Sequence, residues 1–142
     1  MTIEKLIEAT PAALTDINSL LGQLRKDDPT ESQLEDLQTV LASDMHDLLV
    51  VKDGEKIIGM GTLYTMQKLG KRSGHVEDVV VDGAYRGQGL GEKLMQEIIA
   101  TARAKGIQNL YLTSRPIRVA AHALYQKIGF KKKDTQVFKL EL

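Results

Sequence analysis

The chain has no cysteine and only three histidines, and these two scarcities exclude several kinds of chemistry. Without cysteine there are no disulfides, no thiolate metal sites and no covalent acyl-cysteine intermediate. The histidines, His46, His75 and His122, are scattered, and no two of them have a metal-ligand spacing such as H-x-x-x-H. The sequence therefore predicts no metal site.

Neither sign of charge is in excess, and no hydrophobic run is long. The 142 residues include 19 Lys and Arg and 19 Asp and Glu, so the formal net charge is zero. A general nucleic-acid binder would show a basic excess. No apolar stretch approaches a membrane span, and the first residues lack the basic start and apolar core of a signal peptide. We therefore expect a cytoplasmic protein without nucleic-acid or membrane partners.

What the chain does have is the make-up of a globular protein. Its hydrophobic content of 42% and charged content of 27% are ordinary for this class. The length is sufficient for a hydrophobic core, and no repeat, low-complexity segment or linker divides the chain. Residues 1–142 are therefore predicted to form a single domain.

Strand-like and helix-like segments alternate along the chain. Strands are predicted at residues 2–9, 48–52, 56–64, 76–81, 110–113 and 137–142. Helices are predicted by apolar residues at helical spacing within residues 14–24, 34–41, 90–102 and 121–128. Asp27, Asp28 and Pro29 are expected to break the first helix, and residues 68–74 to form a polar loop. This alternation predicts an α/β protein with a mixed sheet and helices on both faces.

Three places have the residue types of a helix start. Thr10 and Pro11 fit a cap and the first helical position. Thr30 and Gln33 fit a capping box for the second helix. Pro116 fits the first turn of the last helix. At the other end of that helix, Gly129 fits a left-handed cap, after which Phe130 would fold back onto the helix.

The most informative stretch is a glycine-rich junction between a predicted strand and the longest apolar stripe. Gly87, Gly89 and Gly91 fall within five residues. A helix N-terminus leaves backbone N–H groups unpaired at the positive end of the helix dipole, which makes it a phosphate-binding device. A dinucleotide fingerprint does not fit, because its third glycine would fall on Glu92. A P-loop does not fit either, because the chain has no G-x-x-x-x-G-K-[ST] run.

The spacing that remains, Arg86-x-x-Gly89-x-Gly91, resembles the pyrophosphate loop of the GNAT N-acetyltransferase superfamily. Residues 121–130, AHALYQKIGF, resemble the late helix of that family, written A-x-x-L-Y-x-x-x-G-F. One helix and one strand lie between the two motifs, as the family fold requires. The resemblance implies the GNAT acyl-CoA N-acyltransferase fold, a splayed sheet of about six or seven strands with about four helices on both faces.

The resemblance also implies an acetyl-CoA-dependent N-acetyltransferase that transfers an acetyl group to a primary amine by direct attack in a ternary complex. The acceptor stays open among small-molecule amines, amino sugars and peptide amines. Residues 74–81 are also similar to the corresponding strand of glucosamine-6-phosphate N-acetyltransferases, where the acidic pair lies at the active site. A non-catalytic acyl-CoA sensor or interaction module on the same fold is the alternative. The resemblance further suggests a homodimer.

The cofactor site is expected around the glycine loop. Its candidate residues are Val79, Val80, Val81, Arg86, Gly87, Gln88, Gly89, Leu90, Gly91, Ser114, Arg118 and Tyr125. In the family, the sheet splays beside the strand equivalent to residues 79–81, whose backbone bonds the pantetheine arm and supplies an oxyanion donor. Arg118 stands where many members of the family carry asparagine, so the usual amide contact does not carry over.

Two carboxylates and one phenol are the candidates for proton transfer. Glu77 is the first candidate for the base, directly or through a water, because burial in an apolar strand raises the pKa of a carboxylate. A structural hydrogen-bonding role is its alternative. Asp78 is the second candidate and is expected on the opposite face, since side chains alternate along a strand. Tyr125 matches the family's general acid, which assists the departing thiolate; a packing role is the alternative.

The sequence does not specify the acceptor. Lys68, Lys71 and Arg72 form a small basic group that suits an anionic acceptor such as a sugar phosphate. A solvated loop is the alternative for these residues. The acceptor must therefore be found by experiment.

Overall fold

The computed structural model describes residues 1–28 and 30–142, which form two compact units, Met1–Leu112 and Thr113–Leu142. The first unit contains β1 (Thr2–Lys5), α1 (Pro11–Leu24), α2 (Leu34–Ala42), β2 (His46–Asp53), β3 (Lys56–Lys68), β4 (Lys71–Val81), the 3-10 helix η1 (Gly83–Tyr85), α3 (Leu90–Ala104) and β5 (Asn109–Tyr111). The second unit contains α4 (Val119–Lys127).

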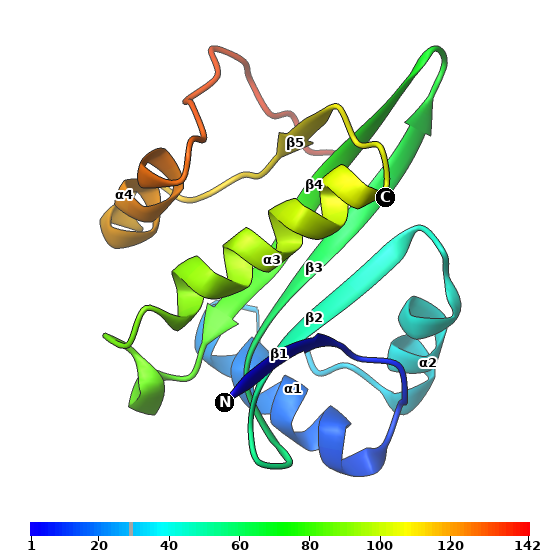
Figure 1. Ribbon diagram of the computed structural model, residues 1–142, viewed down its shortest axis with the longest axis vertical. Helices are drawn as coiled ribbons and strands as arrows, with labels where there is room; N and C mark the ends of the chain where they lie inside the picture. The colour runs from blue at the N-terminus through cyan, green and yellow to red at the C-terminus, as the bar shows by residue number, and fades with distance from the viewer. Residues whose placement is uncertain (29) are drawn as a thin grey trace. The chain divides into compact units, whose positions relative to one another are not determined.

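The strands of the first unit form one mixed sheet in the order β1-β2-β3-β4-β5. The pairs from β1 to β4 are antiparallel, and β5 runs parallel to β4. Helix α3 lies along one face of this sheet, and α1 and α2 cover the other (Figure 1). The predicted mixed α/β sheet with helices on both faces is therefore confirmed.

The described sheet has five strands, fewer than the six or seven expected. The difference lies in part at residues 137–142, which were predicted to be a strand and form none in the second unit. Their apolar side chains are exposed there, with Phe138 at 92%. Alternation of apolar and polar residues specifies a strand only when a neighbouring strand supplies hydrogen bonds.

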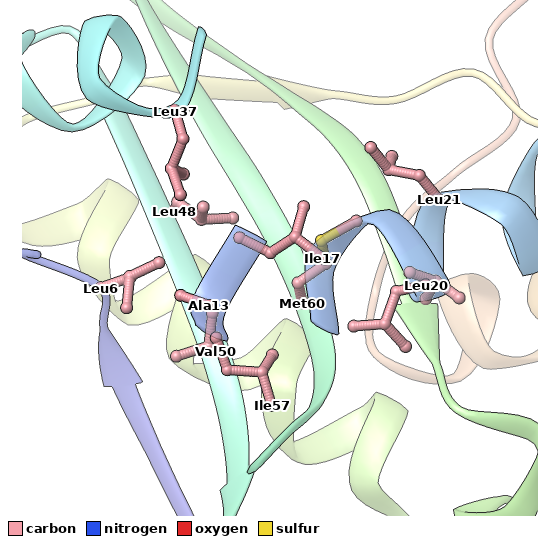
Figure 2. Packing of buried hydrophobic residues seen from close by; sticks show 11 residues of the cluster. Leu6, Ala13, Ile17, Leu20, Leu21, Leu37, Leu48, Val50, Ile57 and Met60 are labelled. Atoms are coloured by element: carbon pink, nitrogen blue, oxygen red, sulfur yellow. The ribbon is translucent and has the colours of Figure 1, made fainter. Parts of the chain in front are cut away.

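The core beneath α1 holds the first unit together. Ile17 and Leu20 on α1 pack toward Val50 on β2 and Met60 on β3 (Figure 2). Each of these four side chains is at most 5% exposed. Burial of one such side chain stabilises the folded state by about 1.5–3 kcal/mol. This packing fixes the end of α1 against β3 and β4, which positions the candidate site described below.

The helix starts in the first unit were predicted with mixed success. Thr10 caps α1 as expected, since its Oγ1 accepts a hydrogen bond from the Ala13 N–H at 3.1 Å. The predicted capping box of Thr30 and Gln33 is wrong. Gln33 is itself the cap of α2, and its N–H donates to Asp36 Oδ2 at 2.7 Å. The side chain of Asp36, three residues after Gln33, therefore sets where α2 begins. Of the predicted helix breakers, Pro29 lies outside the described residues.

The two hairpins of the sheet were also predicted unequally. The strands predicted at residues 48–52 and 56–64 are confirmed, and they pair as a hairpin with its turn at Gly54. The predicted polar loop at residues 68–74 is wrong, because β3 continues to Lys68 and β4 begins at Lys71. Gly70, with φ of +80°, supplies the left-handed residue that a tight turn needs. Polar residues near the turn are thus strand residues on an exposed ribbon.

In the second unit, α4 begins later than predicted. Pro116 precedes the helix, and the first helical residue is Val119. The Arg118 N–H donates to the Arg115 carbonyl at 3.1 Å, so a separate turn comes before α4. The helix end is as predicted. Gly129 has φ of +110°, and the next N–H, of Phe130, bonds back to the Tyr125 carbonyl at 2.9 Å.

Candidate active site

A short, ordered connection leads from β4 to α3. Asp82 caps the 3-10 helix η1, and its Oδ1 accepts a hydrogen bond from the Ala84 N–H at 2.9 Å. The Tyr85 hydroxyl donates to Asp53 at 2.9 Å. Arg86 follows in extended conformation, with its Nε 3.4 Å from the Val81 carbonyl oxygen. The chain thus reaches the glycine loop with the Arg86 side chain near the end of β4.

The glycine loop presents backbone amides at the start of α3. Gly87 and Gly89 have φ of +80° and +73°, which L-residues with a side chain rarely adopt. Gly89 is the cap of α3, and the first helical bond runs from the Lys93 N–H to the Gly89 carbonyl at 3.1 Å. The N–H groups of residues 90–92 therefore precede the helical ladder. They lie at the positive end of the helix dipole.

The loop also has room for a ligand. A Cβ built on Gly87 or Gly89 would meet no other atom within 4 Å. Residues 87–89 are exposed. The backbone conformation is therefore what requires glycine here, and the open side of the loop fits a diphosphate bound by main-chain amides.

One edge of β4 lies open beyond its first few residues. β5 pairs with β4 only from Ser73 to His75. From Val76 to Val81 no strand of the described chain pairs with that edge, although the other edge is bonded to β3. This divergence agrees with the splayed sheet that the family resemblance implies. It leaves backbone groups of Val79, Val80 and Val81 available for hydrogen bonds to a ligand.

A β-bulge interrupts β4 at the acidic pair. The pairing with β3 shifts between Met60, which faces Val80, and Thr62, which faces Glu77. Two residues of β4, Asp78 and Val79, thus lie opposite the single Gly61. Asp78 has φ of +55° and is the only described non-glycine residue with positive φ. A bulge of this kind adds one residue and breaks the alternation of side chains.

The bulge corrects the prediction that Glu77 and Asp78 lie on opposite faces. Glu77 is paired with Thr62, on the α1 side of the sheet together with Met60. Asp78 Oδ1 lies 2.6 Å from Nη2 of Arg25, the residue that caps the end of α1. Both carboxylates therefore lie on the α1 side, because the extra residue cancels one step of alternation.

Three further side chains complete this group, which we call the bulge cluster: Arg25, Tyr64, His75, Glu77 and Asp78. His75 Nε2 lies 2.9 Å from Glu77 Oε1. Tyr64 is the cross-strand partner of His75. Burial raises the pKa of the Tyr64 phenol, and the nearby charges of Asp78 and Glu77 raise it further. The phenol thus stays protonated and can donate a hydrogen bond at neutral pH.

Glu77 is more exposed than the sequence predicted. Its side chain is 47% exposed, whereas that of Asp78 is 20% exposed and ion-paired. The apolar run around Glu77 suggested a strand covered on both faces. In the structure, the α1 side of the sheet is less fully covered at this position.

Sequence reasoning missed Arg25, Tyr64 and His75. His75 and Glu77 are two residues apart on a strand, so the sequence could have predicted that their side chains share one face. Tyr64 was recognisable only as the last residue of the strand predicted at residues 56–64. Arg25 gave no signal, since only the packing of α1 brings its guanidinium to Asp78.

The basic residues considered for an anionic acceptor lie elsewhere. Lys71 and Asp78 are seven strand residues apart, which corresponds to roughly 20 Å. Arg72 bonds the Lys105 carbonyl at 2.9 Å and Gln67 Oε1 at 3.0 Å, and Lys68 lies 5.8 Å from the centre of the Tyr111 ring. In this chain, these residues therefore belong to the hairpin of β3 and β4 and not to the site near Asp78.

In the second unit, Tyr125 is the buried member of α4. It is 8% exposed, and its ring contacts that of Phe130 edge-on at 6.0 Å between centroids. Burial raises the pKa of the Tyr125 phenol. The neighbouring Arg118 guanidinium bonds the hydroxyl and acts to lower the pKa, but burial outweighs it, so the pKa lies above its usual value. Ser114 Oγ is buried without a hydrogen-bond partner among the described residues.

The described residues provide neither a metal site nor a membrane-spanning helix. The described residues contain no group of three or more His, Cys, Asp or Glu side chains that could hold a metal ion. None of the helices at residues 1–28 and 30–142 has the length and apolarity needed to cross a membrane.

Comparison with known proteins identifies the family. The model of the acetyltransferase (GNAT) family matches residues 14–130, most of the chain and parts of both units. The chain belongs to the GNAT acetyltransferase family. The predicted fold class and family are thereby confirmed, and the glycine loop of this acetyltransferase lies inside the matched region.

Several relatives of this acetyltransferase act on one amino sugar. Glucosamine 6-phosphate N-acetyltransferase 1 of Oryza sativa subsp. japonica is 34% identical over 141 residues, covering 89% of this chain and 82% of the rice protein. The Trypanosoma brucei brucei enzyme of that name is 35% identical over 85 residues, covering 58% of this chain and 56% of the relative. The crystal structure of the Arabidopsis thaliana enzyme has a TM-score of 0.79 at 26% identity and covers 98% of this chain and 97% of its own.

These relatives establish the reaction class. The protein is an N-acetyltransferase that moves an acetyl group to an amine, as the resemblance predicted. Members of the family take the acetyl group from acetyl-CoA, which fits the open glycine loop. The absence of cysteine excludes a route through an acyl-cysteine.

Proposed function

We propose that this acetyltransferase acetylates the amino group of an amino-sugar phosphate of the glucosamine 6-phosphate class. The observation that carries the proposal is the 34% identity to the rice enzyme over 89% of this chain. The bulged strand with its acidic pair supports it, since residues 74–81 resemble the corresponding strand of such enzymes.

The donor site in this proposal is the glycine loop and the open edge of β4. The N–H groups of residues 88–91 bind the CoA diphosphate, and Arg86 adds a positive charge at the edge. The backbone of Val79, Val80 and Val81 bonds the pantetheine arm and supplies one N–H to the thioester oxygen. That N–H stabilises the negative charge that develops on this oxygen during attack. The contributions of Ser114 and Arg118 rest on the family resemblance.

The bulge cluster provides the proton acceptor. An alkylammonium group must lose a proton before its nitrogen can attack. Asp78 is committed to the ion pair with Arg25 at 2.6 Å, which leaves Glu77, paired with His75, as the carboxylate that takes part in proton removal. The role of Tyr125 as the acid that assists the departing CoA thiolate rests on the family resemblance. The raised pKa of Tyr125 keeps the phenol protonated, as this role requires.

An acceptor panel tests the proposal. CoA thiol release from acetyl-CoA is followed with glucosamine 6-phosphate, glucosamine, a polyamine, free amino acids and peptide N-termini. We expect the highest kcat/KM for glucosamine 6-phosphate and a much lower value for glucosamine, which lacks the phosphate. A higher kcat/KM for a peptide or polyamine would refute the amino-sugar assignment without affecting the reaction class.

The homodimer, the single domain and the cytoplasmic location stay predictions. Light scattering of the purified protein would measure the mass in solution. A mass of one chain, about 15.7 kDa, would contradict the dimer.

A further inference from the structure

We propose that His75 and Glu77 act as one proton-accepting pair, in which the His75 imidazole takes the proton of the acceptor and Glu77 holds the ring. The inference rests on the proposed function only in that the bulge cluster acts on an amine. It assigns to His75 the role of base and to Glu77 that of a positioning residue. These two roles do not depend on which amine is the acceptor.

The geometry of the pair is that of a histidine oriented by a carboxylate. Nε2 of His75 and Oε1 of Glu77 are 2.9 Å apart, an ordinary hydrogen-bond distance. A carboxylate accepts but does not donate, so a neutral His75 donates from Nε2 and keeps its lone pair on Nδ1. The same relationship orients the base in hydrolases with a histidine and an acid.

The arrangement makes the imidazole the proton acceptor and the carboxylate its support. Glu77 Oε1 lies 2.9 Å from His75 Nε2, so this oxygen is occupied by the ring. Histidine is the side chain that most often acts as a general base, and a carboxylate bound to one ring nitrogen orients the other. His75 Nδ1 is therefore the atom of the pair that is left to take a proton.

The groups that face His75 support this assignment. Tyr64 lies opposite it on β3 and Tyr111 opposite it on β5, so both neighbours are phenols. Around Tyr64, the charge of Asp78 is balanced by Arg25. Glu77 is thus the carboxylate of the bulge cluster whose charge is directed at the imidazole. It can stabilise the imidazolium that forms.

The reaction moves two protons away from the acceptor nitrogen, one to His75 and one to the thiolate. His75 Nδ1, directly or through one water, removes a proton from the ammonium group, and the neutral nitrogen attacks the thioester carbonyl of acetyl-CoA. The new C–N bond forms as the carbonyl π electrons move to oxygen. When the intermediate collapses, the C–S bond breaks, the nitrogen loses its second proton and the thiolate gains one. The imidazolium returns its proton to solvent, and the products are the N-acetyl compound, CoA thiol and one proton.

The decisive kinetic test compares His75→Gln with the wild type across pH. We expect kcat/KM of the variant to fall about 100-fold near pH 7, the usual contribution of a general base. The loss should shrink at alkaline pH, because an acceptor that is already neutral needs no base. Glu77→Ala should show the same trend, and Glu77→Gln, which keeps a hydrogen-bond acceptor, should lose less. Glu97→Gln on the exposed face of α3 is the charge-matched control and should keep the wild-type profile.

A second measurement does not depend on activity. In ¹⁵N spectra of the histidine rings, neutral His75 should carry its proton on Nε2, and Glu77→Ala should mix the two tautomers. His122, outside the bulge cluster, serves as the internal control that does not change. A loss in His75→Gln of equal size at every pH, or a wild-type proton on Nδ1, would overturn the proposal. If no amine in the panel is acetylated, the proposed function fails. The ¹⁵N spectra would still show whether Glu77 holds the His75 ring in one tautomer.

Discussion

Arg25 Nη2 lies 2.6 Å from Asp78 Oδ1, and this ion pair joins the end of α1 to the bulge of β4. The two residues are 53 positions apart in the chain. A guanidinium and a carboxylate at this distance form a charge-assisted hydrogen bond. The pair holds the one described non-glycine residue with positive φ beside the proposed acceptor site.

Loss of that pair should affect the acceptor more than stability. In Arg25→Gln we expect the free energy of unfolding to fall by less than about 1 kcal/mol, because Arg25 is 40% exposed. The KM for the acceptor should rise about tenfold, equivalent to about 1.4 kcal/mol, as Asp78 loses its fixed position. Lys26→Gln is the matched control. An equal weakening of CoA binding in calorimetry would contradict the placement of Arg25 on the acceptor side.

Gly89→Ala should weaken CoA binding through the backbone. Its φ of +73° costs an L-residue about 1–2 kcal/mol, so the loop would rearrange and misalign its amides. We expect the Kd for CoA to rise at least about tenfold in calorimetry. Gly22→Ala in the last turn of α1 is the control, since its Cβ meets nothing within 4 Å. It should raise the free energy of unfolding by up to about 1 kcal/mol and leave the Kd unchanged.

Tyr125→Phe should slow turnover without unfolding the protein. The ring and its contact with Phe130 remain, and only the hydroxyl beside Arg118 is lost. We expect kcat to fall about 100-fold. Because the phenol pKa is raised, the wild type should show no loss from phenol ionisation below about pH 10. Full activity of Tyr125→Phe across this range would remove the hydroxyl from the mechanism.

Asp47 should make stability depend on acid pH. It is 2% exposed and pairs with Lys5 at 2.7 Å and with Lys105. Burial acts to raise its pKa, but the bonds from Lys105 and Lys5 outweigh burial, and the pKa lies below its usual 3.8. The folded state thus holds this proton less tightly than the unfolded state. The stabilisation is complete above about pH 5 and is lost as the pH falls through the lowered pKa.

Urea unfolding of Asp47→Asn measures this contribution. At pH 7 we expect a loss of about 2 kcal/mol, because two lysines lose a buried partner. The difference from the wild type should shrink as the pH falls below about 5, because the unfolded state takes up the proton first and the folded carboxylate follows at its lowered pKa. Lys5→Met should cost less, since Lys5 is 46% exposed. A difference that stays constant with pH would show that the charge of Asp47 does not stabilise the fold.

The elements predicted well were those specified by local signals. Thr10 and Pro11 start α1 because a hydroxyl cap and a fixed φ act within one turn. Gly129 ends α4 because a left-handed residue acts at one position. The element predicted poorly at residues 137–142 depends on a partner strand, and no pattern within six residues supplies one.

The sequence alone determined the family, the glycine loop before α3 and the acidic pair on β4, because each depends on residue types at short spacing. Only the tertiary structure decided how the acidic pair is used. The register of β3 against β4 creates the bulge at Asp78 and turns both carboxylates toward α1. The packing of α1 then brings Arg25 into an ion pair with Asp78, and Glu77 pairs with His75 instead. Strand register and helix packing are set by contacts between distant segments, which local sequence patterns do not encode.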